Sequence, residues 1–141
     1  GALEAAKDNR AAHRKNIAGA LDYVKKNGLL KTRRVVRYFD SGDAIKDTVV
    51  GIVAGMLLNG ENRDMPILAF ADSDEGKKVS ARADRRLVSR GLDLSFVMGS
   101  AAAYVGGDGG GHAVAAGATI PPDSVERFLD AVEDIVMAQI I

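Results

Sequence analysis

Residues 106–117 read Gly-Gly-Asp-Gly-Gly-Gly-His-Ala-Val-Ala-Ala-Gly, and five of the six residues before His112 are glycine. A turn needs only one or two residues at positive φ, and glycine loses more conformational freedom on folding than any other residue. A cluster this dense indicates that the backbone approaches something closely, often an anion held by a row of N–H groups. We predict a glycine-rich loop over 106–111, with His112 at its lip, and then a strand over 112–120. The alternative is a flexible surface loop with an incidental histidine.

The predicted loop matches neither of the common nucleotide-binding motifs. A P-loop has Lys-Ser or Lys-Thr after its glycines and then a helix, whereas His112-Ala113 and a predicted strand follow here. A Rossmann fingerprint needs a strand–loop–helix context, which this stretch lacks. Both nucleotide-binding motifs are therefore excluded.

Composition places the chain among ordinary globular proteins. Its 141 residues fit one domain, with 47% hydrophobic and 27% charged residues. Nineteen basic residues balance nineteen acidic ones, so any anion site must be local. The absence of cysteine excludes disulfides and thiolate metal sites and fits the reducing cytoplasm. The longest apolar run, Val49 to Leu58, is too short to span a membrane, and we expect no membrane association.

The hydrophobic pattern predicts an α/β fold in which helices and strands alternate. Strands are expected over 33–39, 66–71, 77–83 and 112–120, and helices over 2–26, 47–58, 84–90, 94–105 and from Asp123 onward. Asp93 and Asp123 are the expected N-caps of the last two helices, and Glu126 completes a capping box. We predict a single domain with a mixed β-sheet of about four to five strands, helices packed on it and a long N-terminal linker helix before it.

Two features of the predicted helices bear on organisation and close packing. The first half of the helix over 2–26 lacks an apolar stripe, which is typical of a helix that bridges to another domain. We therefore expect residues 1–28 to link to an upstream domain, with the chain continuing before Gly1. Gly51 and Gly55 lie on one face of the next helix, where they would permit close approach to a strand or a ligand.

The strand over 77–83 places Lys78, Ser80 and Arg82 on one face. A hydroxyl and a guanidinium on one rigid face suit phosphate, because arginine offers a planar fork of donors. The alternative is a solvated strand face. Beside a glycine loop with a histidine, we interpret these residues as a phosphate-binding site. The candidate residues are Ser80, Arg82, Gly109, Gly110, Gly111 and His112, with Lys78, Arg85 and Arg86 as supporting basic residues.

These motifs resemble a known family. Val50-Gly51-Ile52-Val53-Ala54-Gly55-Met56, Lys78-Val79-Ser80-Ala81-Arg82, Gly109-Gly110-Gly111-His112 and Ala115-Ala116-Gly117 occur in the family's order and spacing. The chain resembles the DHH-associated domain, the C-terminal accessory domain of DHH-superfamily phosphoesterases, and it looks most like archaeal RecJ-like single-strand exonucleases. The resemblance covers about residues 30–140, so residues 29–141 are expected to form the DHH-associated substrate-binding domain.

The resemblance implies a second domain upstream of this one. In the family, Asp and His residues of the N-terminal domain bind two divalent ions, usually manganese or otherwise magnesium, which activate water for attack on phosphorus. The C-terminal domain faces that site across a cleft and holds the nucleic-acid substrate. By position, Ser80 and Arg82 match the phosphate-contacting strand, and Gly109 to His112 match the loop that closes on the reacting end, with His112 in a catalytic role.

This chain departs from the family in lacking an Asp-His-His motif. Its only histidines are His13 and His112, and no cluster of histidines and carboxylates has two-metal spacing. We therefore expect no metal site and no cofactor in this chain, and manganese or magnesium in the catalytic domain upstream. The parent protein is expected to be a manganese-dependent phosphodiesterase or exonuclease, and this chain alone is expected to be inactive.

The sequence thus predicts a substrate-binding domain for single-stranded DNA or RNA. Its expected partners are single-stranded nucleic acid or short oligonucleotides and the upstream DHH catalytic domain. Two alternatives stay open. One is an RNA-binding or dimerisation module like the C-terminal domain of alanyl-tRNA synthetase, against which His112 argues. The other is a non-catalytic scaffold in a replication complex.

Overall fold

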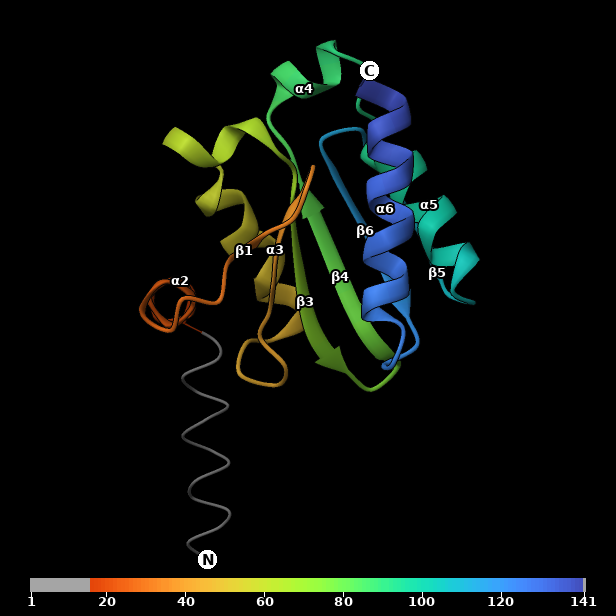
Figure 1. Cartoon of the computed structure of the whole chain (residues 1–141). Helices are drawn as coiled ribbons and strands as arrows, with labels where there is room; N and C mark the ends of the chain where they lie inside the picture. Colours follow the sequence, from red (N-terminus) through yellow and green to blue (C-terminus); the bar gives the residue numbers. More distant parts are fainter. Residues whose placement is uncertain (1–15, 141) are drawn as a thin grey trace, which may run out of the picture.

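The computed structural model describes residues 16–140, in which one mixed β-sheet lies between two layers of helices (Figure 1). The strands are β1 (Lys31–Thr32), β2 (Arg37–Asp40), β3 (Ile67–Ser73), β4 (Gly76–Arg82), β5 (Asp108–Gly111) and β6 (Ala115–Ile120). The helices are α2 (Ile17–Lys26), α3 (Asp47–Leu57), the 3-10 helix η1 (Gly60–Asp64), α4 (Arg85–Ser89), α5 (Leu94–Tyr104) and α6 (Val125–Ile140). The predicted α/β class is confirmed, with six strands instead of four to five.

The strand order across the sheet is β1-β2-β3-β4-β6-β5. Only β2 and β3 are parallel, and α3 lies in the connection between them, as a parallel pair requires. All other neighbouring strands are antiparallel. The order makes β5 an outer strand beside β6, so the glycine run lies at the edge of the sheet.

Alternation along the strands divides the core between the two faces of the sheet. On one face, Ile67 and Ala69 of β3 pack with α3 and α2. On the other face, Leu68 and Phe70 of β3 pack with side chains of β4, β6, α5 and α6. Figure 1 shows α2 and α3 on one side of the sheet and α5 and α6 on the other. Side chains of β4 with even numbers therefore face the α3 side.

The glycine run is a strand and not the predicted loop. Residues Asp108–Gly111 form β5, which pairs in register with β6 through a turn over 112–114. The predicted strand over 112–120 accordingly begins only at Ala115. Close packing explains the glycines, because a Cβ at Gly109 would lie 2.6 Å from the carbonyl oxygen of Met98 in α5. The backbone does approach something closely here, but on this side the neighbour is a helix.

Three predicted boundaries are wrong for local reasons. The strand predicted over 33–39 begins only at Arg37, because Arg33 N–H donates to Val36 O at 2.8 Å and turns the chain between β1 and β2. Asn16 is extended and caps α2, so no single helix runs through it; residues 2–15 of that prediction lie outside the described residues. Ser124, not Asp123, precedes α6, since Phe128 N–H donates to Ser124 O.

The predicted N-cap Asp93 is confirmed, and Asp84, the expected start of the helix over 84–90, is the N-cap of that helix. Asp84 accepts from Arg86 N–H at 2.9 Å and Asp93 from Ser95 N–H at 3.0 Å. These bonds begin α4 and α5. The hydrogen bond from the Ser95 side chain lowers the pKa of Asp93, and the backbone hydrogen bond from Arg86 lowers the pKa of Asp84.

A cluster of charges fastens the β1–β2 turn to α6. Arg33 donates to Glu133 at 2.8 Å, to Asp130 at 2.6 Å and to Glu126 at 3.4 Å. Glu133 is buried and also accepts from the backbone N–H of Val35 at 2.9 Å. Glu126, predicted to complete a capping box, therefore pairs with Arg33. Within residues 16–140, no helix has the length and apolar character needed to cross a membrane.

We predict that Glu133→Gln lowers the free energy of unfolding by about 1–3 kcal/mol, because it removes the buried negative charge and replaces one of two acceptor oxygens with an NH2 donor. Asp134→Asn is the matched control, since it makes the same charge change at the next residue of α6, which is exposed. Urea unfolding of both variants measures the difference. Equal effects in the two variants would show that the Arg33 cluster does not hold the turn.

Candidate functional site

Within residues 16–140, no helix lies above one half of the sheet face on the α3 side. α3 packs on β3 and β4, while β6 presents Ala115, Gly117 and Thr119 on this side, none of them fully buried. Residues of β4, β5 and β6 line a shallow depression there, among them Lys78, Gly110, Gly117 and Thr119. We call this uncovered area of β4, β6 and β5 the open face.

The strand register places most of the predicted site residues on the open face in three parallel rows. Each row crosses from β5 through β6 to β4. The rows are Asp108–Thr119–Lys78, Gly110–Gly117–Ser80 and His112–Ala115–Arg82. The middle strand contributes only small side chains, so the face has a floor of backbone between β4 and β5. Sequence reasoning identified the flanking residues of the rows but missed the floor.

Arg82 is a half-buried cation without a carboxylate partner among residues 16–140. Its guanidinium donates to the carbonyl oxygens of Ala81 at 2.8 Å and of Ala116 at 3.4 Å. Burial lowers the pKa of Arg82, because moving a charge out of water disfavours the charged form. Among residues 16–140, Nε and Nη2 of Arg82 make no hydrogen bond, and Nη2 lies against Gly51 of α3.

Gly51 of α3 forms the wall beside Arg82 and Ser80. A Cβ at Gly51 would lie 2.7 Å from Arg82 Nη2 and 3.1 Å from Ser80 Oγ. The glycine therefore lets the helix pack closely against both side chains at the border of the open face, as expected from the sequence. Gly55 does not do so, because it is exposed with nothing near its Cβ position. Ile52 and Met56, which follow these glycines, are also exposed, so the helix is less buried than its composition predicted.

The glycines of β5 have different roles on the two sides of the strand. Gly109 and Gly111 face α5 and β6: a Cβ at Gly111 would lie 2.6 Å from Ala116 Cα, and φ at Gly111 is +141°. Gly110 faces the open side, and a Cβ there would meet nothing within 4 Å. Of the three predicted glycines, only Gly110 is thus free of a packing requirement.

His112 is held by its backbone at the start of the β5–β6 turn. Its N–H donates to Ala115 O at 2.8 Å and its carbonyl accepts from Ala115 N–H at 3.3 Å. The turn is fixed further where Ala83 N–H donates to Val114 O and Leu94 N–H to Ala113 O, both at 3.0 Å. The residue is exposed, and its imidazole makes no hydrogen bond within the described part of the chain. Alternation from Gly110 places His112 on the side of the open face.

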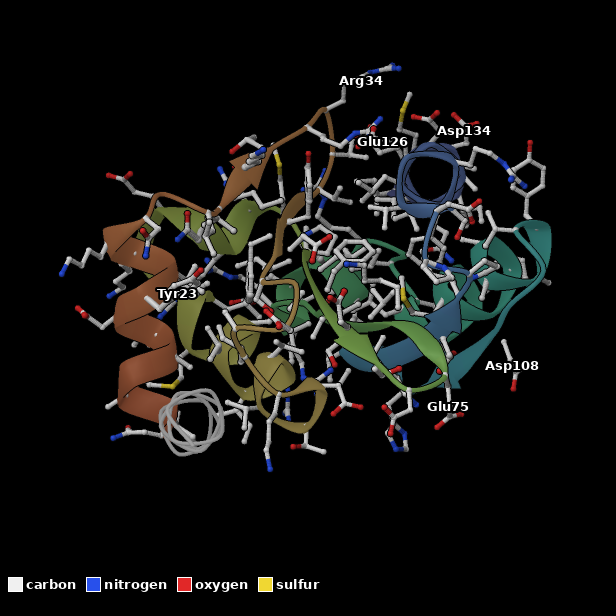
Figure 2. All side chains as sticks on the ribbon, turned by 90° about the horizontal axis from the view of Figure 1, so that it is seen from below. Tyr23, Arg34, Glu75, Asp108, Glu126 and Asp134 are labelled. Carbon is white, nitrogen blue, oxygen red and sulfur yellow. The ribbon has the colours of Figure 1, made fainter. Side chains whose placement is uncertain are left out.

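The two ends of the open face differ in charge. Arg82 and His112 lie in the row at one end. Asp108 lies in the row at the other end with Lys78. Figure 2 shows Asp108 close to Glu75 of the β3–β4 turn. An anionic ligand is therefore favoured at the Arg82 end.

Besides Gly109 and Gly111, two further predicted residues lie outside the rows, and no metal cluster is present among residues 16–140. Arg85 and Arg86 lie on α4, where Arg86 pairs with Asp84 at 3.3 Å. Within the same residues, no three His, Cys, Asp or Glu side chains are grouped to hold a metal ion.

The family described as the DHHA1 domain matches residues 31–138. The chain therefore belongs to this family, which is the DHH-associated C-terminal domain that the sequence motifs predicted. A Methanocaldococcus jannaschii protein described as uncharacterised is 37% identical over 128 residues, which is 91% of this chain. The chain spans only 27% of that relative's length.

Solved structures show the same fold. RecJ from Thermus thermophilus, in complex with Mn²⁺, matches 91% of this chain and 17% of its own, with a TM-score of 0.63 and 20% identity. The C-Ala domain of Aquifex aeolicus alanyl-tRNA synthetase matches 78% of this chain and 96% of its own, with a TM-score of 0.57 and 14% identity. At these identities the likeness concerns the fold alone.

We predict that Gly110→Ala and Gly111→Ala have different effects on stability. Gly111→Ala should lose about 1–3 kcal/mol or more of unfolding free energy, because alanine does not tolerate its φ. Gly110→Ala should melt at or above the wild-type temperature, since its φ is not positive and its Cβ points into open space. Thermal melts check both values. A strongly destabilised Gly110→Ala variant would mean that this glycine is needed for packing.

Proposed function

We propose that this DHHA1 domain binds the phosphates of a single-stranded nucleic acid on its open face and presents the strand to a metal-dependent DHH catalytic domain upstream, as in a RecJ-like exonuclease. The carrying observation is the half-buried guanidinium of Arg82, which has no carboxylate partner within residues 16–140 and lies beside a floor of small residues.

Electrostatics support an anion at Arg82. Among residues 16–140, three other buried or half-buried cations are paired: Arg33 with Glu133, Asp130 and Glu126, Arg37 with Asp64, and Lys77 with Asp40 and Asp72. Within the same residues, the half-buried Lys46 and Lys78 form no ion pair. A buried charge without a partner costs free energy unless a ligand supplies the opposite charge. The planar fork of arginine matches phosphate oxygens, and Ser80 Oγ adds a donor on the same face.

The floor of the open face favours a ligand that approaches the backbone. Gly110 and Gly117 lie opposite one another in the middle row, so in this row no side chain stands between Ser80 and β5. β5 is also the outer strand of the sheet, and part of its N–H groups are not used in the ladder. A strand of phosphates can therefore lie across β6, with Arg82 and Ser80 on one side and β5 on the other.

His112 completes the proposal at the end of the face. Its exposed imidazole lies on a turn held by backbone hydrogen bonds, so its position does not depend on its side chain. An imidazole carried on this turn, in the same row as Arg82, can donate a proton to a phosphate oxygen or stabilise its charge. The metal ions would belong to the upstream domain and would activate the water there. The described residues of this chain do not form a set of metal ligands.

The second candidate is an RNA-binding or dimerisation module. The outer position of β5 favours it, because an uncovered edge strand can pair with another chain. A protein that dimerises through β5 would lose the open edge beside Gly110. Sedimentation equilibrium with and without oligonucleotide separates the two candidates, since the favoured function requires a monomer that binds nucleic acid. A replication-complex scaffold would neither bind the oligonucleotide nor dimerise.

We predict that Arg82→Met weakens binding of an oligothymidylate at least about tenfold, since a charge-assisted hydrogen bond is worth about 1.5–3 kcal/mol. Wild-type binding is expected at about 10⁻⁴ to 10⁻⁶ M. The melting temperature should not fall, because the variant removes a charge that burial disfavours. Fluorescence anisotropy and thermal melts give both values. Arg34→Met, which removes an exposed cation on the β1–β2 turn (Figure 2), is the matched control. Equal weakening by both variants would indicate a diffuse field.

The chain by itself is expected to leave single-stranded DNA, RNA and short oligonucleotides uncleaved, with or without Mn²⁺. The physical reason is that its described residues offer no cluster of metal ligands. A gel assay of a highly purified sample measures this. Manganese-dependent cleavage that His112→Ala abolishes would place the catalytic centre in this chain and overturn the assignment.

Joined to its upstream catalytic domain, the His112→Ala variant should turn over substrate about 10² times or more slowly than wild type. Its melting temperature should match the wild type, since the turn is held by backbone hydrogen bonds alone. Turnover and thermal melts of the same preparation decide between a catalytic and a structural role of His112. A large fall in melting temperature with normal turnover of the folded fraction would make the histidine structural.

A further inference from the structure

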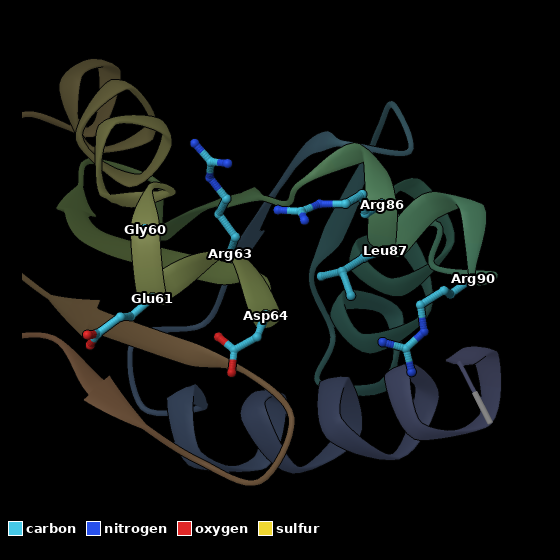
Figure 3. Close-up of a pocket in the computed structure, with 7 residues that line it drawn as sticks. All are labelled: Gly60, Glu61, Arg63, Asp64, Arg86, Leu87 and Arg90. Atoms are coloured by element: carbon cyan, nitrogen blue, oxygen red, sulfur yellow. The ribbon is translucent and has the colours of Figure 1, made fainter.

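A second group of arginines lies beyond the end of β4, outside the open face. η1 and α4 enclose an open cleft of about 390 Å³. Figure 3 shows Arg63 of η1 and Arg86 of α4 extending into the same gap from opposite walls, with Leu87 below them and Arg90 farther along α4. The sequence pointed to a basic cluster on α4 but gave no sign that Arg63 would join it.

The positive charge in this cleft exceeds the negative charge that faces it. Asp84 is the carboxylate shared by two arginines, at 4.0 Å from Arg63 Nε and 3.3 Å from Arg86 Nε. It also accepts from the backbone N–H of Arg86 as the cap of α4. Asp64, which also lines the cleft, pairs with Arg37. Glu61 points away from the arginines (Figure 3).

The excess of guanidinium groups suits a phosphate. Like charges that converge in one cleft repel each other, and an anion between them replaces that repulsion by attraction. Arginine forks bind phosphate oxygens in pairs, from two directions at once. Leu87 contributes an apolar floor that does not compete for the anion. The geometry is therefore that of a phosphate clamp with walls from two separate elements.

The cleft also lies next to the Arg82 end of the open face, where a nucleic-acid strand bound on that face would continue. Arg82 is the last residue of β4, and Asp84 follows two residues later in an extended conformation, about 7 Å along the backbone. At the other end of the open face, Asp108 offsets the charge of Lys78, and Glu75 lies near Asp108 (Figure 2). The charges thus direct a polyanion past Arg82 toward Arg63 and Arg86.

We propose that the cleft between η1 and α4 is a second phosphate-binding subsite, which holds a phosphate of the same single strand beyond the one at Arg82. This inference rests on the proposed function of the open face. It assigns the protein to oligonucleotides long enough to span both places, rather than to mononucleotides or dinucleotides. Arg63 and Arg86 are the contacting residues, and Arg90 adds charge at the far side.

The test compares a short and a long ligand on the Arg63→Gln/Arg86→Gln variant. Dye-labelled thymidine trinucleotide and dodecanucleotide are titrated by fluorescence anisotropy at several salt concentrations. The trinucleotide should bind as in the wild type, because it fills only the open face. The dodecanucleotide should bind at least about tenfold more weakly, with a salt slope that is shallower by about 0.7 for each phosphate that the variant no longer neutralises. Lys31→Gln/Arg34→Gln is the matched control, since it removes two exposed charges from the β1–β2 hairpin.

Three results would overturn the subsite: equal weakening of both ligands, no weakening of either, or the same weakening in the control. A thermal melt of the double variant shows that it is folded, and Arg63→Lys/Arg86→Lys should recover part of the affinity because the charge is kept. If wild-type protein binds neither oligonucleotide, the proposed function fails. The Nε–Hε NMR signals of Arg63 and Arg86 in a titration with pyrophosphate then decide the cleft: shifts support an anion site, and unmoved signals overturn it.

Discussion

Contact between α5 and the bare backbone of β5 is the packing constraint on which the candidate site depends. A side chain at Gly109 would overlap the carbonyl of Met98, and one at Gly111 would overlap Ala116. Because these glycines allow β5 to lie against both α5 and β6, the strand completes the sheet at its edge. The alternation of the strand then leaves Gly110 and His112 on the opposite side. The same glycine run thereby serves packing on one face and an open surface on the other.

Charge pairing distinguishes cations that hold the fold from the cation assigned to binding. Arg33 joins the β1–β2 turn to α6 through three carboxylates, and Lys77 joins β4 to Asp40 and Asp72. For Lys77, burial acts to lower the pKa, but the hydrogen bonds to Asp72 and Asp40 outweigh it and the pKa is raised. Burial alone lowers the pKa of Arg82. A ligand phosphate would supply to Arg82 what the aspartates supply to Lys77.

The sequence predicted the parts of this arrangement that depend on local pattern. The alternation over 77–83 placed Lys78, Ser80 and Arg82 on one face, and the motifs identified the family. The sequence did not predict β5, because glycine has low β-propensity. The strand is stabilised by pairing with β6, a tertiary contact that the local pattern does not show. The joining of Arg63 to Arg86 is likewise tertiary, since η1 and α4 are far apart in the chain. The cap of α6 is Ser124 and not Asp123, because two adjacent polar residues are equally good N-caps in the sequence pattern.

NMR mapping of a bound strand on the ¹⁵N-labelled chain tests the central claim most directly. In a titration with thymidine trinucleotide, the account predicts that the largest shifts fall on the backbone amides of Ser80, Gly110 and Gly117 and on the Nε–Hε of Arg82. Signals of the groove between α5 and α6, at Tyr104 and Arg127, should stay unchanged. Shifts confined to that groove, or no shifts on the open face at saturating ligand, would contradict the assignment of the open face as the phosphate-binding surface.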